Sequence, residues 1–306
     1  MSFSFEVKNE LINAPRNFDG AHHAFSYGVF LFAGAFRKGL MYLRTENTRV
    51  AELYAELAES IVGRPCTDSV KSRSGVYTVS VAEEKDRLKI LKNFGCSENE
   101  IKLRINRSNI GYDMSEDRSC EGAFLAGAFL SCGMITDPQR NYRLEFLVGY
   151  KNLCTDILKM LRDIEVPDPI EPKQTVRKSN YVIYIKNSRN IEDTLTFMGA
   201  GMSALSLMET KVYKDIRNKV NRISNCESAN LDKTLDAGFK QVEAINKIKS
   251  VLGEEGLPEN LRELARLRLE NPQMSLTQLA SELNPPISRS GVNHRLNKLL
   301  KIAQEL

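Results

Sequence analysis

The stretch that decides the fold is Glu121-Gly-Ala-Phe-Leu-Ala-Gly-Ala-Phe-Leu-Ser-Cys-Gly133. It places small residues such as Gly122 and Gly127 among large apolar residues such as Phe124 and Phe129. Small residues at helical spacing let two helix backbones approach each other closely. The stretch therefore predicts a helix that is buried against a second helix, not one that faces water.

The same composition occurs once more upstream. The tetrapeptide Ala-Gly-Ala-Phe stands at Ala33–Phe36 and again at Ala126–Phe129, 93 residues later. A second alignment pairs Val79–Gly95 with Ile183–Gly199 at an offset of 104 residues, and we assign the difference to a longer strand and a proline-containing loop in the second copy. A repeat of this kind predicts an internal duplication, with copies at about 21–95 and 121–199. Two unrelated buried helices that share four residues are the alternative.

Periodicity and turn residues predict the elements of both copies. A short helix at 4–13 precedes them. In the first copy we expect helices at 21–37, 48–62 and 83–94, a strand at 40–44, and a hairpin of 68–73 with 76–81. In the second we expect helices at 121–130, 153–164 and 191–198, and strands at 141–148, near 176 and at 181–185. The prediction is an α+β domain at 1–203, with the two small-residue helices face to face.

Composition limits the classes of function. The chain has 306 residues, of which 42% are hydrophobic and 27% charged, and no apolar run approaches the roughly 18 residues that a membrane helix needs. The first residues lack the pattern of a secretion signal, so we expect a cytoplasmic protein that contacts no membrane. Six cysteines without a Cys-x-x-Cys pair and three histidines disfavour a zinc site and a histidine-based triad, and we expect no cofactor. A net charge of +4 permits nucleic-acid binding without requiring it.

After residue 203 the strand patterns stop. We expect a helical linker at 204–256, with a basic helix at 205–223 and an amphipathic helix at 231–252, and a domain boundary at Gly253-Glu254-Glu255-Gly256. The segment 257–306 predicts three helices, at 258–269, 276–283 and 289–304. Ser275 with Gln278 forms a capping-box pattern, and Ser288 is placed to cap the last helix. This is a helix-turn-helix pattern.

The last helix carries the predicted DNA contacts. No acidic residue occurs from Ser288 to Ala303, and the helix N-terminus offers polar groups that suit base edges and phosphates. We expect Arg289, Ser290 and Asn293 nearest the bases, and Arg295, Lys298 and Lys301 partly on phosphates. The whole predicted DNA-binding set is Ser275, Thr277, Gln278, Ser288, Arg289, Ser290, Asn293, His294, Arg295, Asn297, Lys298 and Lys301. Two other interpretations stay open: a solvated basic face on a small bundle, or a module whose basic helices contact a protein.

The N-terminal domain offers a second DNA surface or a site for a protein partner. Its predicted DNA contacts are the strand residues Lys71, Arg73, Arg140 and Arg143. The expected partner of the whole chain is double-stranded DNA.

Two resemblances add to these observations. Leu125-Ala-Gly-Ala-Phe-Leu-Ser-Cys-Gly133 resembles the LAGLIDADG motif of homing endonucleases, whose scaffold is a doubled αββαββα unit. The run Asn221-Arg222-Ile-Ser-Asn225-Cys226-Glu-Ser-Ala229-Asn230, with Leu269–Pro272 and Ser288–Leu296, resembles the WhiA family of bacterial transcription regulators over essentially the whole chain. The second resemblance implies a LAGLIDADG-derived N-terminal domain, a C-terminal helix-turn-helix that does the main DNA binding, and a role in sporulation, cell division or chromosome segregation.

The first resemblance raises the alternative of a divalent-metal-dependent DNA endonuclease. In those enzymes each motif helix ends in an acidic residue, because two carboxylates hold the ions that activate water. Our alignment puts Cys132 and Gly39 at these positions, and slips of one residue supply no carboxylate either. Asp137 and Glu46 are the candidates for displaced ligands. We therefore expect a regulator that is not an enzyme.

Overall fold

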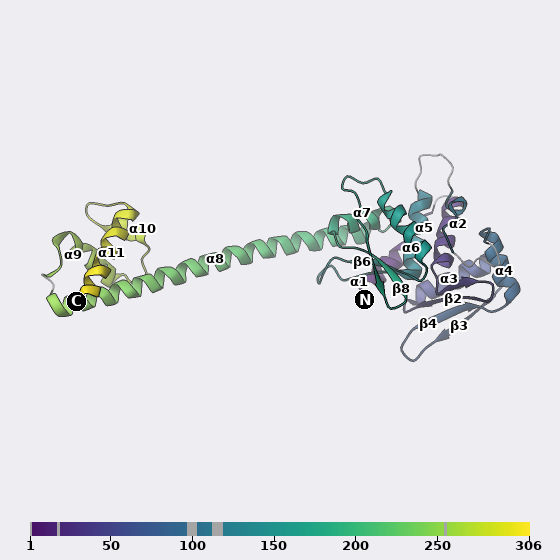
Figure 1. Cartoon of the computed structure of the whole chain (residues 1–306), viewed down its shortest axis with the longest axis horizontal. Helices are drawn as coiled ribbons and strands as arrows, with labels where there is room; N and C mark the ends of the chain where they lie inside the picture. The colour runs from purple at the N-terminus through teal and green to yellow at the C-terminus, as the bar shows by residue number, and fades with distance from the viewer. Residues whose placement is uncertain (1, 17–18, 97–102, 112–118, 254–255) are drawn as a thin grey trace. The chain divides into compact units, whose positions relative to one another are not determined.

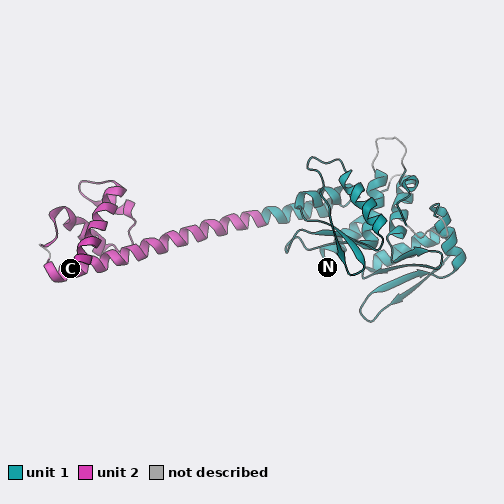
Figure 2. Ribbon diagram, viewed as in Figure 1, with its two compact units in different colours: residues 1–213 teal, residues 214–306 magenta. Residues whose placement is uncertain are grey.

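The computed structural model describes residues 2–16, 19–96, 103–111, 119–253 and 256–306. The chain forms two compact units, residues 1–213 and 214–306 (Figure 2). The first unit contains two αββαββα halves, preceded by helix α1 (Phe3–Asn13). The first half consists of α2 (Asp19–Leu31), β1 (Ala35–Arg37), β2 (Leu40–Thr45), α3 (Thr48–Val62), β3 (Thr67–Lys71), β4 (Tyr77–Val81) and α4 (Glu84–Asn93).

The second half repeats this order after a short 3-10 turn, η1 (Arg107–Ile110). It consists of α5 (Ser119–Cys132), β5 (Gly133–Ile135), β6 (Leu144–Val148), α6 (Lys151–Arg162), β7 (Lys173–Arg177), β8 (Asn180–Ile185) and α7 (Ser188–Met198). Each half has an antiparallel sheet, in the order β1-β2-β4-β3 and β5-β6-β8-β7. The predicted duplication and its α+β class are confirmed.

Helices α2 and α5 pack against each other at the centre of the unit (Figure 1). A Cβ on Gly28 would overlap the carbonyl oxygen of Phe124, and a Cβ on Gly127 would overlap that of Phe25. Each contact is the image of the other under an offset of 99 residues, so the two halves meet about a pseudo-twofold axis. Glycine is required at both positions because backbone atoms occupy the space of a side chain.

This geometry corrects the predicted alignment of the two copies. Helix α2 ends at Leu31, and the upstream Ala-Gly-Ala-Phe lies in the turn after α2 and in β1, whereas Ala126–Phe129 lies inside α5. The expected helix at 21–37 is therefore too long, and the shared tetrapeptide is a coincidence. The predicted offset of 104 residues is confirmed at the other end of the repeat. Gly95 and Gly199 each come after a helix, α4 and α7, and each has a positive φ.

The second unit is helical. Helix α8 (Gly201–Leu252) begins in the first unit and continues into the second, where α9 (Glu259–Glu270), α10 (Leu276–Glu282) and α11 (Arg289–Glu305) follow. One apolar core joins Ile245 and Ile248 of α8 to Leu261 of α9, Leu279 of α10 and Leu296 of α11, all fully buried. Gly253 thus lies inside this unit, not at its edge, and α8 replaces the two helices expected in the linker.

Candidate functional site

Helix α11 is held with one face on α10 and the other in solvent. Val292, Leu296 and Leu299 are buried in the core of the unit. Residues three or four apart share a helix face, so the opposite face presents the exposed residues Ser290, His294, Asn297 and Lys301. Arg289 and Asn293, which were predicted to lie nearest the bases, are also exposed, at the edge of this face.

Both predicted helix caps are present. Ser275 Oγ accepts a hydrogen bond from the Gln278 backbone N at 3.3 Å, and Gln278 Oε1 accepts one from the Ser275 N at 2.9 Å. Ser288 Oγ accepts a hydrogen bond from the Gly291 N at 3.1 Å. These side chains therefore hold the helix termini in place.

The structure exposes most of the predicted DNA contacts. Among the described residues no carboxylate lies within 4.0 Å of Arg289, Arg295, Lys298 or Lys301, and only Ser275 and Arg295 of the predicted set are partly buried. The exposed members are Thr277, Gln278, Ser288, Arg289, Ser290, Asn293, His294, Asn297, Lys298 and Lys301. Cations that have no carboxylate partner among the described residues are available to an anionic partner.

Arg268 of α9 holds the segment between α9 and α10, and the sequence patterns did not identify this role. Its side chain is buried, and its Nη1 donates hydrogen bonds to the carbonyl oxygens of Pro272 at 3.2 Å and Met274 at 2.7 Å. Burial lowers the pKa of its guanidinium. The available signal was its place in the apolar row of α9, after Leu261 and Leu264.

The four predicted strand contacts of the first unit belong to two different sheets. The register pairs Lys71 with Tyr77 on the helix-covered side of its sheet, with the Lys71 Nζ 4.9 Å from the centre of the Tyr77 ring. Arg143 donates from Nε to Glu145 Oε1 and stacks over Tyr184. Arg73 and Arg140 are exposed, in turns that belong to different sheets.

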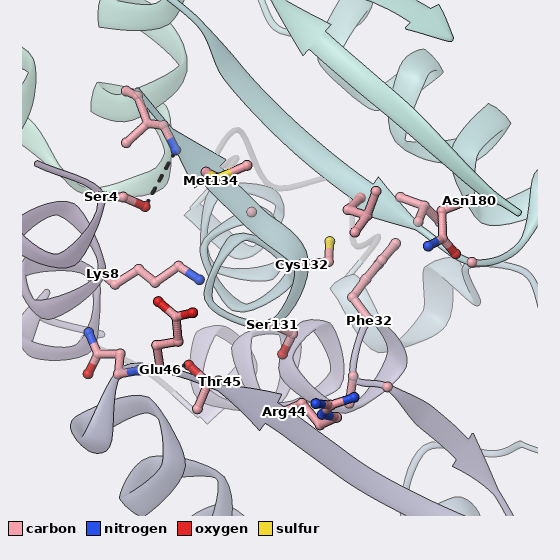
Figure 3. A pocket seen from close by; sticks show the side chains of 18 of the residues that line it. Ser4, Lys8, Phe32, Arg44, Thr45, Glu46, Ser131, Cys132, Met134 and Asn180 are labelled. Atoms are coloured by element: carbon pink, nitrogen blue, oxygen red, sulfur yellow. Dashed lines mark hydrogen bonds between the residues drawn. The ribbon is translucent and has the colours of Figure 1, made fainter. Parts of the chain in front are cut away.

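A pocket of about 940 Å³ lies at the C-terminal ends of α2 and α5, which are called the motif helices because they correspond to the LAGLIDADG motifs (Figure 3). Its walls include the ends of α2 and α5, and side chains of α1 and of the end of β2. Lys8 of α1 donates from Nζ to the carbonyl oxygen of Leu130, at 3.0 Å, in the last turn of α5. Burial lowers the pKa of Lys8 from its ordinary value of 10.5 to about 8, against smaller opposing effects of Cys132 and Glu46.

The pocket also corrects the position matched to Cys132. The offset that relates Gly28 to Gly127 relates Ala33-Gly34 to Cys132-Gly133, and both pairs line the pocket. Gly39 lies instead in the turn between β1 and β2, with open space around it. The matched positions are therefore Ala33, two residues after the end of α2, and Cys132, the last residue of α5, and neither supplies a carboxylate.

The donor set does not fit a divalent metal ion. Ala33 has no ligand atom, and burial raises the pKa of the Cys132 thiol to about 12, so the thiol stays protonated. Asp137 is outside the pocket wall and accepts a hydrogen bond from the Gln139 N at 2.8 Å, while Glu46 lines the pocket beside Lys8. Within the described ranges, no group of three or more His, Cys, Asp or Glu side chains is placed to hold a metal.

The fold and these two sites define a class: a LAGLIDADG-like domain joined to a helix-turn-helix unit. Residues 121–217 match the family model of the WhiA LAGLIDADG-like domain, and residues 220–303 match that of the WhiA C-terminal HTH domain. The chain therefore belongs to the WhiA family.

Individual relatives match most or all of the chain. The probable cell division protein WhiA of Caldicellulosiruptor saccharolyticus is 38% identical, over 92% of this chain and 84% of its own. The protein of the same name from Clostridium botulinum is 34% identical, over 100% of this chain and 99% of its own. The crystal structure of full-length WhiA from Thermotoga maritima shares the fold, with a TM-score of 0.58, 22% identity and coverage of 100% and 99%. No helix in the described part of the chain has the length and apolar character to cross a bilayer.

Proposed function

We propose that this chain is a non-catalytic, sequence-specific DNA-binding regulator of cell division, chromosome segregation or sporulation, located in the cytoplasm on the nucleoid. The observation that carries the proposal is the exposed face of α11, which has no acidic residue from Ser288 to Ala303. Capped N-termini of α10 and α11 and a shared buried core hold this helix in place. The names of the relatives support the connection with cell division.

In the proposed complex α11 enters the major groove of double-stranded DNA. Arg289, Ser290 and Asn293 lie nearest base edges, and Arg295, Lys298 and Lys301 lie partly on phosphates. His294 and Asn297 join the base-facing group, because they lie on the face opposite the core. Thr277 and the N-terminus of α10 approach the backbone beside them.

The test is DNA binding by the full chain, measured by fluorescence anisotropy on duplexes selected from a random pool. Arg289→Ala is expected to cost about 1–3 kcal/mol and to relax specificity at one base pair, whereas Lys301→Ala is expected to weaken all sequences alike and to lower the salt slope by about 1. Arg266→Ala is the matched control, since Arg266 is exposed on α9 and paired with Glu270.

Two outcomes would contradict the proposal. Affinity that is independent of both Arg289 and Arg295 favours a protein-binding module. Nicking of supercoiled plasmid that requires Mg²⁺ and is lost in Asp137→Ala or Glu46→Gln identifies an endonuclease.

In cells, we expect genome-wide DNA occupancy of the full chain to be lost in a fragment that ends at Gly253.

The first unit then serves as a second DNA surface or as a site for a protein partner. Arg73 and Arg140 are the exposed candidates for DNA contact. If Arg73→Ala and Arg140→Ala leave both affinity and salt slope unchanged, these two residues make no phosphate contact.

A further inference from the structure

The C-terminal ends of α2 and α5, the two motif helices, place partial negative charge in one pocket. Helix α2 ends at Leu31 and α5 at Cys132, and both ends line the same pocket. The last carbonyl groups of a helix have no partner within the helix and carry a partial negative charge of roughly one half of an electron charge. The carboxylate of Glu46 lines the same pocket.

Helix α1, which belongs to neither half of the repeat, supplies a cation at this point. The Lys8 side chain reaches the end of α5 and donates to the Leu130 carbonyl oxygen at 3.0 Å. Its ammonium group also lies 5.9 Å from the centre of the Phe129 ring and faces the carboxylate of Glu46 (Figure 3). Arg44 at the end of β2 is the other basic residue among the described residues that line the pocket, and Lys8 is the one that donates to the end of a motif helix.

We propose that the Lys8 ammonium takes the place that a divalent cation would hold at the ends of the motif helices. It balances the charge of the α5 end and of Glu46, and it excludes a metal ion from the pocket. Exclusion follows because an ammonium and a divalent cation within a few ångströms of each other repel strongly at low dielectric. The proposal is independent of DNA binding by α11.

The direct test restores the carboxylates with and without Lys8. Ala33→Asp/Cys132→Asp supplies one carboxylate at each helix end, and adding Lys8→Met removes the charge while keeping a chain of similar length. Isothermal titration with MnCl₂ is expected to show binding to the triple variant at least about tenfold tighter than to the double variant, a difference of about 1.4 kcal/mol. Equal affinities, or no binding by either variant, overturn the proposal.

A second measurement decides the question if the triple variant does not fold. In the otherwise native chain, Glu46→Gln is expected to offset part of the change in the unfolding midpoint that Lys8→Met causes. Lys89→Met is the matched control, because Lys89 Nζ donates to the Val62 carbonyl oxygen at 2.7 Å at the end of α3, outside the walls of this pocket. Its effect is expected to add to that of Glu46→Gln. Additive effects of Lys8→Met and Glu46→Gln overturn the proposal.

Discussion

At the scale of single residues, the two halves of the first unit are held by backbone contact at Gly28 and Gly127. Each glycine lies against the carbonyl oxygen of a phenylalanine in the opposite helix, so neither has room for a methyl group. Glycine is thus required at a position in α2 or α5 where a backbone atom of the opposite helix occupies the space of a side chain.

This contact predicts the effect of adding one methyl group. Gly28→Ala or Gly127→Ala is expected to lower the free energy of unfolding by about 2 kcal/mol or more, because a backbone atom cannot move aside cheaply. Gly39→Ala is the control, since open space surrounds Gly39. Urea unfolding of the three variants checks the prediction, and an equal loss in Gly39→Ala would contradict it.

Lys8 predicts a dependence of stability on pH. Its pKa is about 8 in the folded chain and 10.5 ordinarily, so above pH 8 the folded chain releases this proton before the unfolded chain does. The contribution of Lys8 to stability therefore rises with pH across that window. The free energy of unfolding of the native chain is expected to gain roughly 1–3 kcal/mol over that of Lys8→Met between pH 8 and about pH 10. Urea unfolding of both proteins at each pH measures the gain, and a constant difference would exclude a lowered pKa.

At the scale of elements, the sequence predicted helix and strand types well and their exact limits less well. Local signals sufficed in the second unit, because Ser275, Gln278 and Ser288 act on the next turn of their own helix. They did not suffice for β1, which is three residues long and exists through its pairing with β2. Pairing between distant residues also set the alignment of the halves, so a tetrapeptide match gave Gly39 where the interface gives Ala33.

The caps of α10 and α11 predict separable losses of stability. Ser275→Ala and Ser288→Ala are each expected to cost about 1 kcal/mol, since each leaves a helix N-terminal N–H without its acceptor. Ser281→Ala serves as the control, because Ser281 Oγ donates to the Thr277 carbonyl oxygen inside α10 and does not cap a helix N-terminus. Thermal unfolding followed by circular dichroism measures the three variants, and a loss in the control as large as in the caps would refute the assignment.

At the scale of the whole molecule, sequence reasoning found two kinds of unit but divided them differently. The predicted boundary at 253–256 was placed where Gly253-Glu254-Glu255-Gly256 ends the amphipathic pattern, whereas the contacts divide the chain after Tyr213. Ile245 and Ile248 of α8 show why, since both are fully buried in the core of the helix-turn-helix unit. The role of Lys8 was missed for a related reason. It is one of 43 basic residues, and its contact with the end of α5, 122 residues away, cannot be found from local sequence.

The observed division predicts which fragments fold. Residues 214–306 are expected to unfold cooperatively and to bind DNA, whereas residues 257–306 lose Ile245 and Ile248 and are expected to be largely unfolded or much less stable. Circular dichroism with thermal melting distinguishes the two fragments. A cooperative transition of residues 257–306 at the same temperature would show that α8 is dispensable.

The glycine interface between α2 and α5 joins two halves that belong to one chain. The same pair of halves made from two separate subunits would come apart at low concentration, because its assembly obeys mass action. Here the linking chain keeps the local concentration of one half near the other high at any dilution. The first unit therefore stays assembled even at a few copies per cell, and its two halves were free to diverge without either having to recognise a copy of itself.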